Sequence, residues 1–148
     1  MRDTETNPVT ARAPSNDAAP YRLLHTMIRV KDLEVSLFFY TGLLGMRLLR
    51  KTDYPSGKFT LAFVGYGPEA TQAVIELTHN WGREEAYDIG TGFGHLAIGV
   101  PDLAEACARL KNAGVPIPRP PGPMAHGGTN IAFIVDPDGY KVELIERP

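Results

Sequence analysis

The chain has 148 residues, of which 43% are hydrophobic and 22% charged, and its 15 Lys and Arg against 17 Asp and Glu leave a formal charge of −2. This composition indicates one globular domain and excludes a fibrous or wholly disordered chain. A near-neutral charge without a basic block predicts no binding to nucleic acid, and no apolar run approaches the ~20 residues of a membrane span. The single cysteine, Cys107, excludes an intrachain disulfide and a multi-cysteine metal site, so we expect a cytoplasmic protein.

Residues 1–20 differ in composition from the rest of the chain. They are rich in Asn, Thr, Ala, Pro and acidic residues and contain one valine. The acids Asp3, Glu5 and Asp17, together with the lack of an apolar stretch, argue against a secretory signal or a transit peptide. Such a segment cannot bury enough apolar surface to offset its ordering entropy. We therefore expect a disordered tail over 1–20 and a single folded domain over 21–148.

The folded part repeats itself at an offset of 70 residues. The segment HTMIRVKDL at 25–33 matches HLAIGVPDL at 95–103 at five of nine positions, where average composition predicts about one match or fewer. Further matches at the same or a slightly shorter offset are Ala62-Phe63 with Ala132-Phe133 and Glu76-Leu77 with Glu143-Leu144. Two copies with so long a period indicate a duplicated module rather than a solenoid.

Each module is predicted to have the element order βαβββ. In module one, over 21–82, we expect a strand at 24–30, a helix that begins after the N-cap Asp32 and ends near Gly42, and strands at 46–51, 59–64 and 73–78. In module two, over 93–148, we expect a strand at 96–100, a helix that begins after the N-cap Asp102 and ends at Gly114, and strands at 115–118, 130–135 and 140–145. A linker over 83–92 joins them. The sequence thus predicts an α+β fold of two tandem βαβββ modules.

Side-chain alternation places one His or one Glu on the same face of four equivalent strands. His25 and His95 oppose the apolar residues of the first strand of each module, and Glu76 and Glu143 oppose those of the last strand. A strand with one solvated face normally carries assorted polar residues there. Two imidazoles and two carboxylates on one sheet surface form a mixed nitrogen and oxygen site for a divalent metal such as Zn, Ni, Co, Mn or Fe. The alternative reading is two independent, solvated His/Glu pairs.

The folded part resembles the glyoxalase I family of the vicinal oxygen chelate superfamily, in HTMIRVKDLEVSLFFYTGLLGMRLL, LAFVGYGPE, AVIELTHNWG, GFGHLAIGV and DPDGYKVELIE. The resemblance covers essentially all of 21–148. It implies an open, strongly curved mixed sheet around a divalent metal, whose ligands would be His25, Glu76, His95 and Glu143. It also implies a homodimer with the sites at the interface, where each metal takes ligands from both chains.

For the reaction, the resemblance implies the metal-dependent isomerisation of the glutathione hemithioacetal of methylglyoxal to S-lactoylglutathione. Glu143 would be the catalytic base, and Arg29 and Asn80 resemble the family's contacts with its co-substrate glutathione. The lack of inserted segments is similar to short bacterial members, which favour Ni or Co over Zn. Where the family places a Lys before two glycines in a loop, this chain has His126 before Gly127.

The alternative function is that of another member of the same superfamily, such as an antibiotic-sequestering protein, a thiol transferase or a dioxygenase. The transferase and dioxygenase types use three protein ligands, and the sequestering proteins use no metal. Four candidate ligands and the segment THNWG favour the isomerase over these alternatives.

Overall fold

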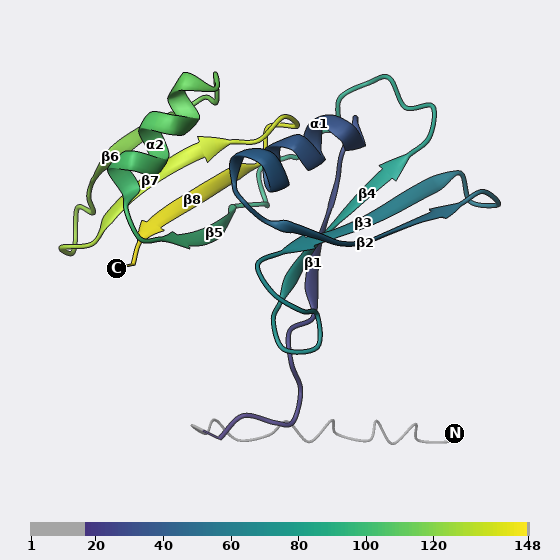
Figure 1. The fold of residues 1–148 in the computed structure, drawn as a ribbon, viewed down its shortest axis with the longest axis horizontal. Coiled ribbons are helices and arrows are strands. Elements are labelled where there is room, and N and C mark those ends of the chain that lie inside the picture. Colours follow the sequence, from purple (N-terminus) through teal and green to yellow (C-terminus); the bar gives the residue numbers. More distant parts are fainter. Residues whose placement is uncertain (1–16, 148) are drawn as a thin grey trace, which may run out of the picture.

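The computed structural model describes residues 17–147, and Figure 1 shows their fold. Module one contains β1 (His25–Arg29), α1 (Leu33–Leu37), the π-helix η1 (Phe38–Leu43), β2 (Arg47–Tyr54), β3 (Phe59–Gly65) and β4 (Val74–Asn80). Module two contains β5 (His95–Val100), α2 (Leu103–Asn112), β6 (Arg119–Pro123), β7 (Asn130–Val135) and β8 (Lys141–Glu146). The predicted tail lies outside the described residues except for 17–20, which belong to no helix or strand.

The strands form two four-stranded mixed sheets with equivalent orders, β1-β4-β3-β2 and β5-β8-β7-β6. In each sheet the first and last strands of the module pair in parallel, and the remaining neighbours pair antiparallel. This crossover brings the strand that carries His next to the strand that carries Glu. The predicted α+β fold of tandem βαβββ modules is confirmed.

Both helices begin at the predicted N-caps. The Asp32 carboxylate accepts a hydrogen bond from the N–H of Val35 at 3.2 Å, and the Asp102 carboxylate accepts one from Glu105 at 3.0 Å. The first helix continues beyond α1 as η1, and this change of helical pitch buries two consecutive aromatic residues, Phe39 and Tyr40.

The prediction of a strand over 115–118 was wrong, because β6 lies at Arg119–Pro123. The apolar residues Val115 and Ile117 pack against the core from an extended connection, which produces the same alternation as a strand. β6 itself has the sequence RPPGP and lies at the edge of its sheet, where a missing N–H group is tolerated.

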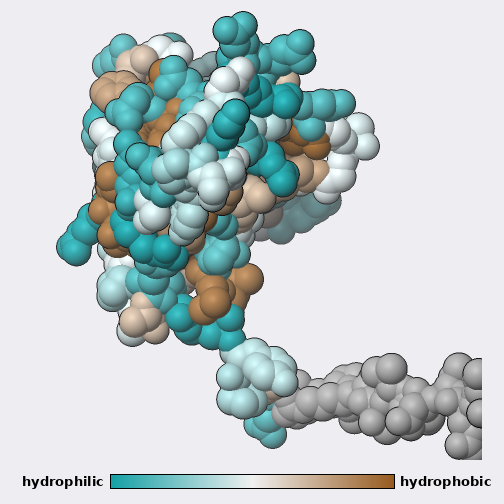
Figure 2. Space-filling model, turned by 90° about the vertical axis from the view of Figure 1, so that its right-hand side faces the viewer, coloured by the Kyte–Doolittle hydropathy of each residue, from teal (hydrophilic) through white to brown (hydrophobic). Residues whose placement is uncertain are grey.

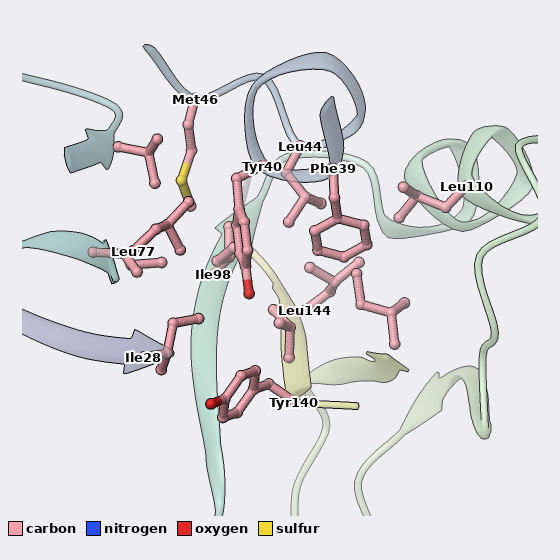
Figure 3. Packing of buried hydrophobic residues seen from close by; sticks show 14 of the residues in the cluster. Ile28, Phe39, Tyr40, Leu44, Met46, Leu77, Ile98, Leu110, Tyr140 and Leu144 are labelled. Atoms are coloured by element: carbon pink, nitrogen blue, oxygen red, sulfur yellow. The ribbon is translucent and has the colours of Figure 1, made fainter. Parts of the chain in front are cut away.

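One hydrophobic cluster joins the two modules (Figure 3). It contains Ile28 and Leu77 of module one together with Ile98 and Leu144 of module two. These four side chains lie on the strand faces opposite the predicted ligands, as the alternation predicts. The division at 82 and 93, with the linker over 83–92, stays a prediction from the repeat. Over residues 17–147, no helix has the length and apolar character needed to cross a membrane.

Candidate metal centre

The four predicted ligands form two equivalent pairs, one on each sheet. Nε2 of His25 lies 3.1 Å from Oε2 of Glu76, and Nε2 of His95 lies 2.7 Å from Oε2 of Glu143. The two His side chains are 36% and 39% exposed and the two Glu side chains 14% and 13%, so the pairs also match in burial. We call His25 and Glu76 the first half-site, and His95 and Glu143 the second half-site.

Strand register explains why each pair meets. In the parallel pairing of β1 with β4, Glu76 is the partner of Met27, two residues after His25. In the parallel pairing of β5 with β8, Glu143 is the partner of Ala97, two residues after His95. Residues two apart in a strand share a face, so the same register puts one imidazole beside one carboxylate in both modules.

A phenylalanine ring packs against each candidate His ligand. Phe63 is the cross-strand partner of Glu76 and lies edge-on to His25, with ring centroids 5.4 Å apart. Phe133 is the partner of Glu143 and lies edge-on to His95 at 5.1 Å. Sequence reasoning missed both rings as parts of the site, although the repeated Ala-Phe dipeptide was a signal for them. The rings limit the rotation of the imidazoles and make each half-site apolar on one side.

The two half-sites differ in the contacts of the arginine that lies across from the phenylalanine, Arg50 in the first and Arg119 in the second. The guanidinium of Arg50 lies 3.6 Å from the ring centroid of Phe63 and donates two hydrogen bonds to the Glu69 carboxylate, at 2.8 and 3.1 Å. These bonds hold the pKa of Glu69 below its ordinary value. Arg119 has the equivalent strand position opposite Phe133, but its guanidinium donates to backbone carbonyls, such as that of Ile131 at 2.8 Å.

The predicted substrate contacts Arg29 and Asn80 belong to the sheet of the first half-site. Arg29 ends β1 and Asn80 ends β4, and both share the strand face of His25 and Glu76. Arg29 is exposed, whereas Asn80 is half-buried and donates its side-chain N–H to the hydroxyl of Tyr87 at 3.0 Å.

One cavity adjoins the second half-site, and another lies at the end of β4. A cavity of about 720 Å³ next to His95 is lined by Thr91, Phe133, Arg119 and Lys141 among others, and its described lining contains two cationic side chains and no carboxylate. A second cavity, of about 580 Å³, is lined by Asn80 and the loop that follows β4. His126 lies exposed in the turn between β6 and β7.

The described part of a single chain does not bring the two half-sites together. Over residues 17–147, no group of three or more His, Cys, Asp or Glu side chains is arranged to hold a metal ion. The donor types nevertheless fit a divalent transition metal, since each half-site offers one imidazole nitrogen and one carboxylate. That all four residues ligate one metal stays a prediction.

Comparison with known proteins adds independent information. The family model of the "Glyoxalase/Bleomycin resistance protein/Dioxygenase superfamily" matches residues 22–144. A probable lactoylglutathione lyase of Synechocystis sp. is 64% identical over 124 residues, which are 84% of this chain and 94% of that protein. A lactoylglutathione lyase of Escherichia coli O157:H7 is 56% identical over 126 residues, which are 85% of this chain and 93% of that protein.

Solved structures that are similar to this chain include glyoxalase I proteins. The crystal structure of glyoxalase I from Zea mays matches with a TM-score of 0.81 at 51% identity, and covers 85% of this chain but only 44% of the maize chain. The trypanothione-dependent glyoxalase I of Leishmania major matches with a TM-score of 0.75 at 48% identity, over 85% of this chain and 86% of that one. The chain thus spans less than half of the maize protein and most of the Leishmania protein.

Proposed function

The chain belongs to the glyoxalase superfamily and, within it, to the lactoylglutathione lyase family, and on this premise we propose that it converts the glutathione hemithioacetal of methylglyoxal to S-lactoylglutathione. The observation that carries the proposal is the repetition of a His/Glu pair in both modules, with separations of 3.1 and 2.7 Å. One such pair from each module would give a divalent cation four protein donors of mixed nitrogen and oxygen type.

We propose one divalent metal per subunit, held by His25, Glu76, His95 and Glu143. Bacterial relatives align with this chain over 91–94% of their own length, so the chain has the size of the short bacterial form. On that resemblance we favour Ni or Co over Zn. When bound, the cation would stabilise the negative charge that develops on two adjacent substrate oxygens.

We propose a homodimer in which the first half-site of one chain and the second half-site of the other hold each metal. Exposed apolar side chains around β1 support this proposal, because Leu23 and Leu24 are 70% and 55% exposed and Met27, between His25 and Arg29, is also exposed. Figure 2 shows apolar atoms at the surface next to the point where the chain enters the fold. Apolar patches of this kind mark association surfaces.

Positive charge near the second half-site supports an anionic co-substrate. Glutathione carries two carboxylates, and Arg119 and Lys141 line the cavity next to His95 without a neutralising carboxylate in its described lining. Arg29 and Asn80 supply a guanidinium and an amide on the face of the first half-site. We propose that these groups bind the carboxylates and peptide groups of glutathione.

Glu143 is the proposed catalytic base. Its carboxylate removes the carbon-bound proton of the hemithioacetal, which leaves an ene-diolate. The hydroxyl proton moves to the adjacent oxygen, and Glu143 returns the first proton to the neighbouring carbon to give the 2-hydroxyacyl thioester. No atom is gained or lost, so the reaction needs no further reactant. His25 and His95 act as neutral nitrogen donors, and the Phe63 and Phe133 rings exclude water from one side of each half-site.

We place this activity in the cytoplasm, because the single cysteine, Cys107, is buried as a free thiol and the proposed co-substrate is itself a thiol. The rival functions within the superfamily, sequestration of an antibiotic, thiol transfer or dioxygenation, use no metal or three protein ligands. A complete His/Glu pair in each module favours the isomerase.

An ultraviolet assay of thioester formation tests the proposal. Metal-free protein is reloaded separately with Ni, Co and Zn and supplied with methylglyoxal and either glutathione or trypanothione. We expect thioester formation with glutathione, fastest with Ni or Co. No thioester with any metal and thiol would overturn the proposed function, and a faster reaction with trypanothione would overturn the assignment of glutathione.

A further inference from the structure

The turn between β7 and β8, in module two, accepts hydrogen bonds from three groups of module one. In the turn between β7 and β8, the Asp138 carboxylate accepts hydrogen bonds from the backbone N–H of Lys31 at 2.8 Å and from the hydroxyl of Ser36 at 3.3 Å. The Asp136 carboxylate accepts one from the hydroxyl of Tyr40 at 2.7 Å. We call Asp136, Asp138 and the following Tyr140 the clasp.

The clasp also binds β1 directly. The hydroxyl of Tyr140 donates a hydrogen bond to the backbone carbonyl of Arg29 at 2.8 Å. Figure 3 shows Tyr40 and Tyr140 within the core that the two modules share. The clasp therefore holds the end of β1 and the helix after it against the start of β8.

The contact between Tyr40 and Asp136 is buried, so it has one defined geometry. Tyr40 is 0% exposed and Asp136 is 4% exposed. The other oxygen of Asp136 accepts the backbone N–H groups of Asp138 and Tyr140, at 2.9 and 2.8 Å, so one carboxylate fixes both the turn and its partner helix. Burial raises the pKa of Tyr40, which keeps its hydroxyl protonated as the donor. Breaking such a contact leaves a buried polar group without a partner.

The clasp connects one strand of the first half-site with one strand of the second. β1 contains His25, and β8 contains Glu143, three residues after Tyr140. No strand of one sheet pairs with a strand of the other among the described residues. The orientation of one half-site relative to the other within a chain therefore depends on the shared core, on the clasp and on a hydrogen bond from the Arg109 guanidinium of α2 to the backbone carbonyl of Leu43 at 2.6 Å.

The repeat does not require this arrangement. In module one the equivalent connection, between β3 and β4, is the longer loop over 66–73, and its Tyr66 donates a hydrogen bond to Leu44 of the same module at 2.6 Å. A βαβββ module therefore forms without a clasp. The contact of module two with module one is an additional feature that the repeat leaves unexplained.

We propose that Asp136, Asp138 and Tyr140 are positioning residues that set the orientation of the second half-site relative to the first. This inference rests on the proposed dimer with shared metal sites. In such a dimer each chain supplies one half of each site, so a rotation between the halves of one chain misaligns both metal sites at once. The clasp acts on the metal ligands through β1 and β8 and touches neither metal nor substrate.

Two tyrosine variants with the same chemistry separate positioning from stability. Tyr140→Phe removes a hydrogen bond between modules, and the control Tyr66→Phe removes a tyrosine-to-carbonyl hydrogen bond within module one. We compare Ni affinity by competition with a chelator, together with the melting temperature of the metal-free proteins. We expect Tyr140→Phe to weaken Ni binding about tenfold, the scale of a lost supporting contact, and Tyr66→Phe to leave it within about twofold. Tyr40→Phe breaks the clasp from the other side and should behave as Tyr140→Phe does.

A second measurement needs no metal. We attach nitroxide labels to cysteines introduced as Arg47→Cys and Ala108→Cys, at two exposed positions, in a Cys107→Ala background. Dilution with unlabelled chains ensures that the measured distance is the one between the two modules of a single chain. We expect Tyr140→Phe to broaden the distance distribution and Tyr66→Phe to leave it narrow. Equal widths and equal Ni affinities for the two variants would overturn the positioning role. A wild-type chain that binds no Ni, with broadening still confined to Tyr140→Phe, would overturn the proposed metal function while supporting the orienting role.

Discussion

Nε2 of His95 lies 2.7 Å from Oε2 of Glu143, and both residues lie on a different sheet from His25 and Glu76. One imidazole and one carboxylate supply only two protein donors, which bind a divalent cation weakly, whereas two such pairs supply four. The number of metal ions that each chain binds therefore distinguishes shared sites from independent pairs.

We expect one tightly bound Ni or Co per chain, measured by equilibrium dialysis and elemental analysis. His25→Ala should abolish tight binding altogether, because both sites of a homodimeric variant lose a ligand, and His95→Ala should do the same. Two ions per chain, with each variant losing only one of them, would show that the half-sites act independently.

Mixing two inactive variants should restore activity. In a heterodimer of His25→Ala with His95→Ala, one site lacks two ligands and the other keeps all four. Random exchange of subunits makes half of the dimers heterodimers, so we expect roughly a quarter of the wild-type activity. The control is a mixture of His25→Ala with Glu76→Ala, which both damage the first half-site and should remain inactive. Equal recovery in both mixtures would contradict shared sites.

Glu143→Gln should separate ligation from proton transfer. Gln keeps an oxygen donor and the shape of the side chain but cannot accept the carbon-bound proton, so kcat at saturating metal should fall at least ~10²-fold. Metal occupancy should fall only modestly. The matched variant Glu76→Gln changes the equivalent residue of the first half-site and should retain more of kcat. A near-normal kcat for metal-saturated Glu143→Gln would leave Glu143 as a ligand only.

X-ray absorption of the Ni-loaded protein should show nitrogen and oxygen scatterers only. Cys107 is buried on α2 at 4% exposure, and burial raises the pKa of its thiol, so a thiolate ligand is disfavoured. Cys107→Ala should leave the spectrum unchanged. A sulfur shell near ~2.3 Å that disappears in this variant would contradict the proposed ligand set.

Sequence pattern predicts the half-sites because their geometry is local. His95 and Glu143 follow from strand alternation together with a repeat, and the parallel register of two neighbouring strands then brings them together. The same reasoning wrongly predicted a strand over 115–118. Val115 and Ile117 pack on the core from an extended connection, which has the periodicity of a strand.

The placement of one half-site relative to the other has no local pattern. It depends on contacts such as Ser36 with Asp138, which are 102 residues apart, and Tyr140 with Arg29, which are 111 apart. The segment DPDG reads as an ordinary turn, and nothing in its composition shows that its carboxylates bind the first helix. Phe63 and Phe133, which pack on the candidate His ligands, appear in the sequence only as a repeated Ala-Phe dipeptide, and nothing in that dipeptide indicates a role in the site.

Asp136 should make the stability of the fold depend on pH in an unusual direction. Burial raises the pKa of its carboxyl above the ordinary 3.8, although hydrogen bonds from Tyr40, Tyr140 and Asp138 act in the opposite direction. The folded chain therefore holds this proton more tightly than the unfolded chain. The resulting contribution to the free energy of unfolding is complete below pH 3.8 and is lost as the pH rises through the raised pKa.

Asp136→Asn isolates this contribution, because the variant retains the other titrating groups and lacks this one. We expect the free energy of unfolding of the metal-free wild-type chain, minus that of Asp136→Asn, to decrease steadily as the pH rises from roughly 3 to 7. Urea unfolding of both chains at each pH measures the difference, and the groups that the two chains share cancel from it. A constant difference would show that the hydrogen bonds from Tyr40 and from the turn balance burial at Asp136, and a difference that increases with pH would show that they outweigh it; either result would contradict the raised pKa.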